Sequence, residues 1–153
     1  ELGHSPRVIL SGRTINDNMA HTIAKEIIQH LVQQDFKLRE VKTLIMGATF
    51  KENVRDARNS KIVDLVNELQ SFLLNVEIYD PLVDRDDFEK EYELKLTEKI
   101  GESYDVVVLG VTHDQFQAYD EHFFQNRISE NGLFYDLRGS FRHKIRHVTY
   151  KSL

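Results

Sequence analysis

The chain has 153 residues, of which 41% are hydrophobic, enough to bury one full core and to predict one compact domain with an appended element. Its 25 acidic and 20 basic residues give a formal charge of −5. No stretch concentrates Lys and Arg as a nucleic-acid-binding surface requires, so nucleic acid is not expected as a partner. The absence of cysteine excludes disulfides, thiolate metal sites and a cysteine nucleophile from this chain.

The apolar runs are short. The longest, such as Val106–Val111, fall far below the roughly 20 residues of a membrane span, and the first residues show no signal-peptide pattern. We therefore expect a cytoplasmic protein without membrane insertion. The sequence begins at Glu1 without Met, and residues 1–11 show no periodicity, so we interpret the chain as a piece of a longer protein.

The first predicted element is a long helix over residues 16–34. Its apolar residues form two neighbouring rows spaced by four, one with Ile15, Met19, Ile23, Ile27 and Leu31 and the other with Ala20, Ala24, Ile28 and Val32. An apolar stripe this wide is hard to bury against one small domain. We therefore expect the helix Ile15–Val32 to pack on more than one surface and to mediate a homodimer.

Beyond residue 42 short apolar strands alternate with helical patterns. Strands are predicted at residues 43–46, 76–79, 104–111 and 133–136, with an edge strand at 148–150. Asn59 or Ser60 can cap a helix that reaches about Leu74, with Ile62, Val66, Leu69 and Leu73 on one face. Further helices are predicted at residues 86–92, after a capping Asp114, and at residues 121–127.

This alternation predicts an α/β fold with a doubly wound, mainly parallel, Rossmann-like sheet preceded by the long helix. We place the helix and its lead-in at residues 1–38 and the α/β domain at residues 39–153. Ligands in such folds bind beyond the carboxyl ends of the strands. The site is therefore expected in the loops that follow Met46, Tyr79, Leu109 and Asp136.

The loop after the first strand carries a candidate ligand site. In Gly47–Lys51, backbone amides, a lysine and an aromatic ring could hold a phosphate and a base. The loop is not a P-loop, because Lys51 is followed by Glu52 rather than Ser or Thr, and no G-x-G-x-x-G turn for NAD is present. Taken alone, the loop favours the alternative account, in which Phe50 is a core residue and Lys51 a solvated charge.

Arginines supply further candidates. Arg55, Arg58 and Lys61 lie near the start of the next helix, where an anion is favoured, although they could instead pair with nearby carboxylates on the surface. Arg138 follows the fourth strand and could bind phosphate or carboxylate, or form a salt bridge with Asp136 or a neighbouring residue.

The histidines indicate neither catalysis nor a metal. His113 and Asp114 are adjacent, but helix capping explains the aspartate, and we predict no catalytic residue in this chain. None of the seven histidines has H-x-x-x-H or H-E-x-x-H spacing, so no metal site is predicted.

Four segments together carry a resemblance to a known family. They are Gly12–Met19, Gly47–Ser60, Ile78–Pro81 and Tyr135–Arg138, spread over nearly the whole chain. In their order and spacing they resemble the UDP-glucose/GDP-mannose dehydrogenase family, in particular the end of its central dimerisation helix and its C-terminal UDP-sugar-binding domain. The sequence Asn16-Asp17-Asn18-Met19 and the loop after the first strand look closer to the UDP-N-acetylhexosamine branch.

The resemblance implies roles for individual residues. Phe50, Lys51 and Arg138 would contact the UDP-sugar, and Arg58 would approach NAD across an interdomain cleft. The family's NAD-binding domain, catalytic cysteine and companion residues would precede Glu1, so the chain alone is expected to be inactive.

The intact protein would be an NAD-dependent oxidoreductase that makes UDP-uronic acids for bacterial surface polysaccharide. The alternative is a stand-alone nucleotide-binding module with a regulatory or interaction role and no catalysis.

Overall fold

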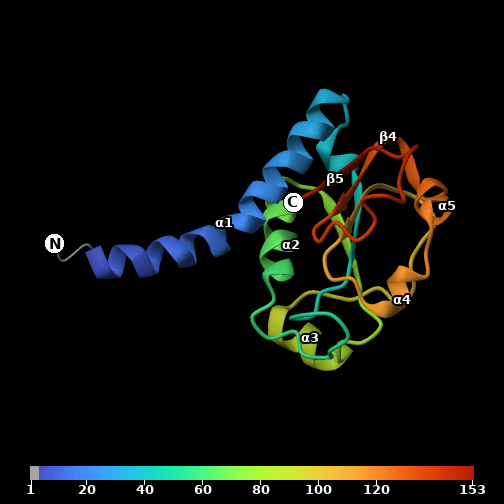
Figure 1. Ribbon diagram of the computed structural model, residues 1–153. Coiled ribbons are helices and arrows are strands. Elements are labelled where there is room, and N and C mark those ends of the chain that lie inside the picture. The colour runs from blue at the N-terminus through green and yellow to red at the C-terminus, as the bar shows by residue number, and fades with distance from the viewer. Residues whose placement is uncertain (1–3) are drawn as a thin grey trace.

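The protein is an α/β domain with one five-stranded parallel sheet, seen in a computed structural model (Figure 1). The structure describes the backbone of residues 4–153 and the side chains of residues 18–153. The elements in chain order are α1 (His4–Gln33), a 3-10 turn η1 (Leu38–Glu40), β1 (Lys42–Met46), α2 (Lys61–Ser71), β2 (Asn75–Tyr79), α3 (Arg85–Tyr92), β3 (Tyr104–Leu109), α4 (Asp114–Gln117), α5 (Glu121–Gln125), β4 (Ile128–Asp136) and β5 (Tyr150–Ser152).

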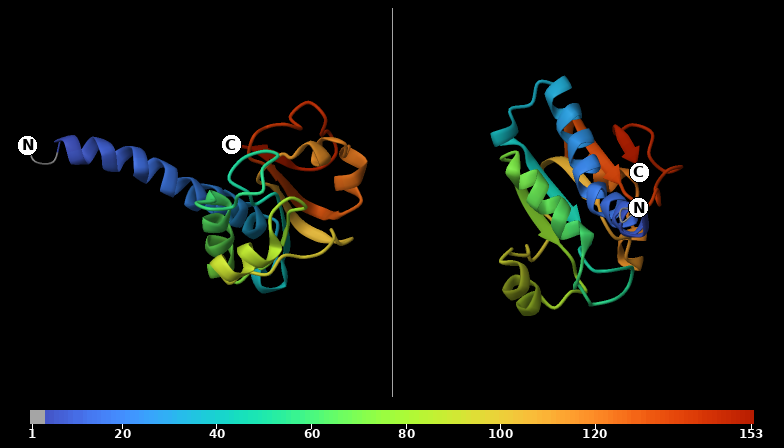
Figure 2. Two further views of the ribbon diagram at one scale, coloured as in Figure 1. Left: turned by 90° about the horizontal axis from the view of Figure 1, so that it is seen from below. Right: turned by 90° about the vertical axis from the view of Figure 1, so that its left-hand side faces the viewer.

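The strand order β2-β1-β3-β4-β5, with every neighbouring pair parallel, confirms the predicted doubly wound sheet. Helices α1 and α2 lie on one side of the sheet and α4 and α5 on the other (Figures 1 and 2). Each side has its own apolar cluster. Because side chains alternate along a strand, Ile45 of β1 joins the α1/α2 cluster while Leu44 and Met46 join the other.

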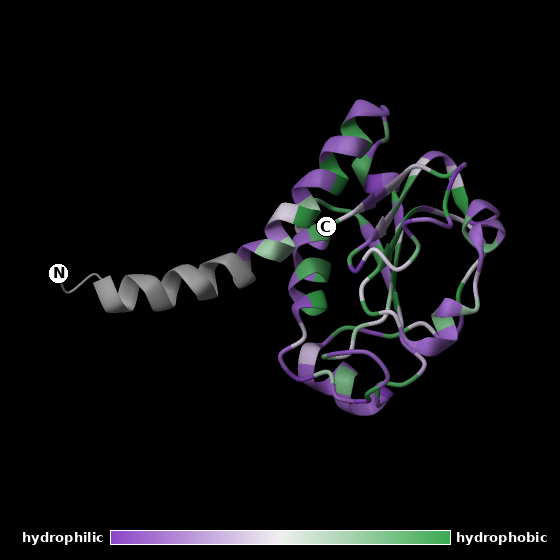
Figure 3. Ribbon diagram, viewed as in Figure 1, coloured by the Kyte–Doolittle hydropathy of each residue, from purple (hydrophilic) through white to green (hydrophobic). Residues whose placement is uncertain are grey.

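The second half of α1 belongs to the core of the domain. Its apolar residues Ala20, Ile23, Ala24, Ile27 and Leu31 are at most 3% exposed, and Figure 3 shows the apolar sides of α1 and α2 turned toward the sheet. These residues are covered by packing within the chain, whereas Val32 of the second row is 56% exposed. The predicted contribution of Ile15 lies outside the described side chains.

Two side-chain hydrogen bonds also tie α1 to β4. The Tyr135 hydroxyl donates to Glu26 (2.7 Å), and a His30 ring nitrogen lies 2.8 Å from the Asn131 carbonyl oxygen. Burial and the bond to Glu26 raise the pKa of Tyr135.

Ser60 caps α2 as predicted, since its hydroxyl accepts from the Ile62 amide at 3.2 Å. The helix stops at Ser71, however, and Leu73 has a positive φ of 74° and is 53% exposed. Its predicted place on the buried face is wrong, because the chain turns before that position reaches the sheet.

Strand boundaries also differ from the predictions. Strand β3 ends at Leu109 rather than Val111. Strand β4 begins at Ile128 rather than Leu133, with an irregular register opposite Tyr104–Val106, and β5 lies at 150–152 rather than 148–150. The early part of β4 contains polar residues 129–131 and Gly132 and so lacks the apolar run by which the strand was predicted. Among the described residues, no helix is long and apolar enough to cross a membrane.

Candidate functional site

A buried aspartate joins three loops at the carboxyl edge of the sheet. Asp80 directly follows β2 and is 7% exposed. Its Oδ2 accepts from the Ala48 amide in the loop after β1 (2.7 Å) and lies 3.0 Å from Nε2 of His113 in the loop after β3. Its Oδ1 accepts from the amides of Leu82 and Val83 at 2.8 and 3.1 Å.

The bonds to Asp80 are suited to a charged carboxylate. Burial disfavours the ionised form, but the hydrogen bonds from His113, Ala48 and Leu82 favour it more and hold the pKa of Asp80 below its ordinary value. Asp80 is thus an anionic acceptor that fixes the loops after β1, β2 and β3 relative to one another.

His113 is fully buried, and it connects Asp80 to Asn53 of the β1 loop. The Asn53 amide lies 3.0 Å from Nδ1 of His113, and because an amide can only donate, Nδ1 must accept. The ring proton is thereby assigned to Nε2, which donates to Asp80. Asp80, rather than the adjacent Asp114, is therefore the carboxylate partner of His113.

Asp114 does not cap α4 as predicted. It is the first residue of that helix, and His113 occupies the N-cap position without a side-chain capping bond. Asp114 instead exchanges two hydrogen bonds with Asn53, one from its own amide to the Asn53 side chain (2.9 Å) and one from the Asn53 side chain to its carboxylate (3.1 Å). Asp114 thus helps to hold the loop after β1. Local sequence does not predict this contact, because Asn53 and Asp114 lie 61 residues apart.

The candidate residues Phe50 and Lys51 are exposed on this loop, Phe50 by 58%. The interpretation of Phe50 as a core residue is therefore wrong. Their backbone is held beneath them, since the Phe50 amide donates to the Asp56 carbonyl (2.7 Å) and the Thr49 hydroxyl donates to the Lys51 carbonyl (2.8 Å). An ordered loop thus presents a ring and an ammonium group to solvent.

Arg138 lies close to the same loop. Its guanidinium is 3.5 Å from the Glu52 carboxylate, an ion pair with both side chains partly exposed. The predicted alternative partner, Asp136, is fully buried and accepts from the amides of Gly139 and Phe141 at 3.1 and 2.7 Å. It also accepts from the Tyr150 hydroxyl at 2.6 Å. The fold thus brings Arg138 beside Phe50–Glu52, although 86 residues separate Arg138 from Glu52 in sequence (138 − 52).

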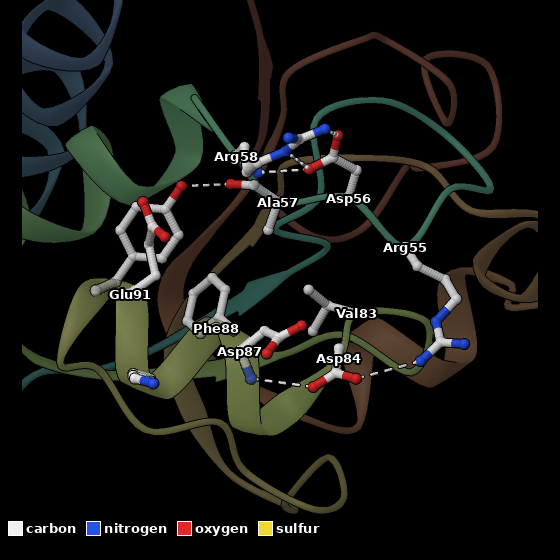
Figure 4. Close-up of a pocket in the computed structure, with 11 residues that line it drawn as sticks. Arg55, Asp56, Ala57, Arg58, Val83, Asp84, Asp87, Phe88 and Glu91 are labelled. Atoms are coloured by element: carbon white, nitrogen blue, oxygen red, sulfur yellow. Dashed lines mark hydrogen bonds and ion pairs between the residues drawn. The ribbon is translucent and has the colours of Figure 1, made fainter.

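Arg58 lies apart from that group, in a pocket of about 850 Å³ between the β1–α2 loop and α3 (Figure 4). Its guanidinium makes two 3.0 Å bonds to the Asp56 carboxylate, and Arg55 lies 3.5 Å from Asp84 on another side of the pocket. The bond from Arg58 lowers the pKa of Asp56 to about 2. Phe88 and Tyr92 also line the pocket, and the Tyr92 hydroxyl donates to the Ala57 carbonyl.

Arg58 is paired with Asp56, as the surface-network account anticipated. Arg55 pairs with Asp84, a partner outside that account. Lys61 is exposed at the start of α2. The β1–α2 loop thus offers two separate charged groups, residues 50–52 beside Arg138 and residues 55–58 beside α3.

The glycine turn of this sheet is packed against protein rather than open to a dinucleotide. Gly47 has φ of 88°, and a Cβ there would lie 2.3 Å from the Val111 carbonyl oxygen. Its lack of a side chain is required by the close approach of the β1 and β3 loops. The Gly47 turn is therefore filled by the chain itself and is not a dinucleotide-binding turn.

No group of three or more potential metal ligands comes together in residues 18–153. Sequence reasoning missed Asp80 and the role of His113. A usable signal existed, because Asp80, His113 and Asp136 each lie at or just beyond the end of a parallel strand, at one edge of the sheet.

Residues 44–143 match the model of the UDP binding domain of the UDP-glucose/GDP-mannose dehydrogenase family. The chain belongs to this family. The matched region contains the Asp80–His113 network and all four candidate residues, Phe50, Lys51, Arg58 and Arg138.

Two relatives cover most of the chain. UDP-N-acetyl-D-glucosamine 6-dehydrogenase of Salmonella typhi is 33% identical over 138 residues, which are 90% of this chain and 32% of that protein. Protein CapL of Staphylococcus aureus is 36% identical over 140 residues, 91% of this chain and 33% of that protein. The chain thus spans about a third of the length of these relatives.

The fold agrees with solved structures of the family. The UDP-N-acetyl-mannosamine dehydrogenase Cap5O of Staphylococcus aureus superposes with a TM-score of 0.75 over 99% of this chain and 34% of that one, at 20% identity. At this identity the likeness concerns the fold alone.

Proposed function

We propose that this chain is the nucleotide-sugar-binding part of an NAD-dependent UDP-sugar 6-dehydrogenase, with a UDP-N-acetylhexosamine as substrate. The observation that carries the proposal is the Glu52–Arg138 ion pair, which places Arg138 beside the loop of Phe50 and Lys51 within the matched UDP binding domain. The relatives named above support the choice of sugar.

The three side chains offer what a nucleoside diphosphate requires. Lys51 supplies a point charge and Arg138 a planar fork of donors, which together suit the two phosphates. The exposed Phe50 ring offers a flat apolar surface for a base or sugar. Arg138 would exchange its exposed pairing with Glu52 for the ligand, at small cost because such surface pairs contribute only about 0–1 kcal/mol.

In the intact protein, the sugar C6 alcohol would be oxidised to a carboxylate in two NAD-dependent steps. NAD supplies the hydride acceptor when bound, and Arg58 would contact it from the pocket beside α3. The threefold greater length of the relatives supports the view that the catalytic residues lie outside residues 1–153. The chain alone would then bind ligand without turnover.

The wider setting follows from the same proposal. UDP-uronic acids would be supplied in the cytoplasm for surface polysaccharide. Residues 1–38 would form the end of a dimerisation helix, with Ile15–Val32 contributing to a homodimer, and residues 39–153 the UDP-sugar-binding domain. Sedimentation of the chain over a range of concentrations tests the dimer, and a monomer at the highest concentration would remove this helix as a sufficient interface.

Calorimetric titration with UDP and UDP-N-acetylglucosamine tests the binding site. Saturable binding is expected, and Lys51→Ala and Arg138→Ala should each weaken it by about tenfold or more, the loss of roughly 1.4 kcal/mol. Lys37→Ala and Arg39→Ala are matched controls, because both residues are exposed just before β1, at the opposite edge of the sheet. Equal affinities in all four variants would contradict the assignment of the site.

The absence of turnover is tested separately. The chain mixed with NAD and UDP-N-acetylglucosamine should give no increase in NADH absorbance. A steady increase would place catalytic groups within residues 1–153.

A further inference from the structure

The buried His113 bridges the sheet and the exposed loop that carries Phe50 and Lys51. On one side its Nε2 faces Asp80 at 3.0 Å, and on the other its Nδ1 faces the Asn53 amide at 3.0 Å. Both side chains of the Asp80–His113 pair are fully buried. We infer that His113 is a positioning residue for nucleotide-sugar binding, which holds the Phe50–Lys51 loop in its binding conformation through the Asn53 amide; this inference rests on the proposed function.

The contact with His113 acts on the loop backbone at residue 53 itself, whereas the amides of Ala48 and Phe50 anchor the backbone before it. The Phe50 amide bonds to Asp56, and Ala48 bonds to Asp80. Asn53 itself has a positive φ of 63°, a conformation that is uncommon for non-glycine residues although asparagine adopts it more readily than most. The His113 ring restrains this residue at its backbone, and Asp114 restrains it at its side chain.

The chemistry requires an acceptor at one end of the side chain and a donor at the other. Neutral imidazole with its proton on Nε2 provides both. The Thr49 hydroxyl, 3.4 Å from Nε2, already donates to the Lys51 carbonyl and so cannot replace the Nε2 proton as a donor to Asp80. The ring of Phe116 packs against the imidazole with centroids 5.4 Å apart and holds it in place.

Two substitutions separate the two bonds. In His113→Asn, the short amide can place an acceptor near Nδ1 for Asn53 but does not reach Asp80. In His113→Gln, the longer amide can donate to Asp80 but leaves the Asn53 amide without a partner. Each variant loses one buried hydrogen bond, so a merely structural role predicts equal effects on the loop, whereas positioning through Asn53 predicts different ones.

Hydrogen exchange followed by NMR measures the loop directly and without ligand. The Asn53 amide should exchange about tenfold or more faster in His113→Gln than in His113→Asn, after correction for the global stability of each variant. The UDP dissociation constant should rise about tenfold in His113→Gln and remain within about threefold of the parent in His113→Asn. In the parent, the ¹⁵N shifts of His113 should show a neutral ring with the proton on Nε2.

The outcomes are distinguishable. Equal Asn53 exchange in the two variants, or a proton on Nδ1, would overturn the positioning role whatever the ligand does. Faster exchange in His113→Gln with unchanged UDP affinity would overturn its link to binding. Failure of the parent chain to bind UDP would count against the proposed function, while the exchange data would still decide whether His113 holds the loop.

Discussion

Asp80 and Asp136 are both buried aspartates at the carboxyl ends of parallel strands, yet they hold their loops in different ways. Asp80 bonds to Ala48 and His113, which are 32 and 33 residues away in sequence and belong to two other loops. The partners of Asp136 are Gly139, Phe141 and Tyr150, all within 14 residues. Asp80 therefore joins separate parts of the sheet edge, while Asp136 shapes the turn that follows its own strand.

The difference shows that the two halves of the proposed ligand site are held by different kinds of contact, one between distant loops and one within a single segment. Besides its local bonds, the Lys51 loop is held by contacts to Asp80 and His113 that exist only after β1, β2 and β3 have assembled. The Arg138 turn is held mainly by bonds within its own segment, including the bond of the Gly139 amide to Asp136. Substitutions at Asp80 should consequently affect several loops, and substitutions at Asp136 chiefly one.

The largest effect is expected from Asp80→Ala. It leaves the Ala48 amide and the His113 Nε2 proton buried without an acceptor, and because each such donor costs about 1–3 kcal/mol, the free energy of unfolding should fall by about 3–5 kcal/mol. Urea denaturation measures this. Asp80→Asn, which keeps an acceptor oxygen, should lose less, and a loss below about 1 kcal/mol in Asp80→Ala would contradict the role of Asp80 in joining the loops.

Asp136→Ala should cost less, about 2–3 kcal/mol, because its amide donors lie in one turn that can rearrange toward water. Tyr150→Phe removes only one of the three bonds and should cost about 1 kcal/mol. Hydrogen exchange sharpens the comparison. Asp136→Ala should leave the amides of residues 48–53 as protected as in the parent, and faster exchange there would show that the two regions are coupled.

Thr43 on β1 is a contrasting buried polar group. Among the described residues its hydroxyl is the only buried side-chain donor or acceptor without a partner, and the residue is fully buried. Thr43→Val should therefore raise the free energy of unfolding by about 1 kcal/mol, since no hydrogen bond is lost. Thr49→Val is the matched control and should be destabilising, because the Thr49 hydroxyl donates to Lys51.

The last effect depends on pH and is expected at Glu121, a carboxylate nearer the surface that accepts from the amides of residues 146–148. The bond from the His147 amide is the main cause that lowers the pKa of Glu121 from 4.5 to about 2. A lowered pKa stabilises the fold fully above the unfolded value of 4.5, and the gain is lost as the pH falls toward 2. Thermal unfolding of the parent and Glu121→Gln should differ at pH 6 and converge near pH 2. A gap independent of pH would contradict this assignment.

Local patterns in the sequence determined much of the fold. The 3.6-residue spacing of α1 and α2, the Ser60 cap and the apolar strands β1 and β3 depend on side chains that lie near one another in sequence, and the structure confirms them. Their alternation was enough to predict a parallel doubly wound sheet and the edge at which ligands bind. The four landmark segments were enough for the family.

Boundaries and partners were decided by the tertiary structure. Leu73 left the buried face because the chain turned at the end of α2. The early part of β4 pairs with β3 at Ile128, opposite Tyr104, before the register shifts, and its polar Ser129 donates to the Asp105 side chain at 2.7 Å. The secondary-structure propensities of the residues do not predict these effects, because the effects depend on packing and hydrogen bonding with a neighbouring element.

The same limit applies to the site. The sequence by itself determined that Phe50, Lys51, Arg58 and Arg138 follow strands or begin a helix at one edge of the sheet. Only the tertiary structure decided that Arg138 meets Glu52, that Arg58 lies in a separate pocket, and that His113 bonds to Asp80 rather than to its neighbour Asp114. The physical reason is that hydrogen bonds and ion pairs act over about 3–4 Å, a distance set by strand order and register rather than by separation along the chain.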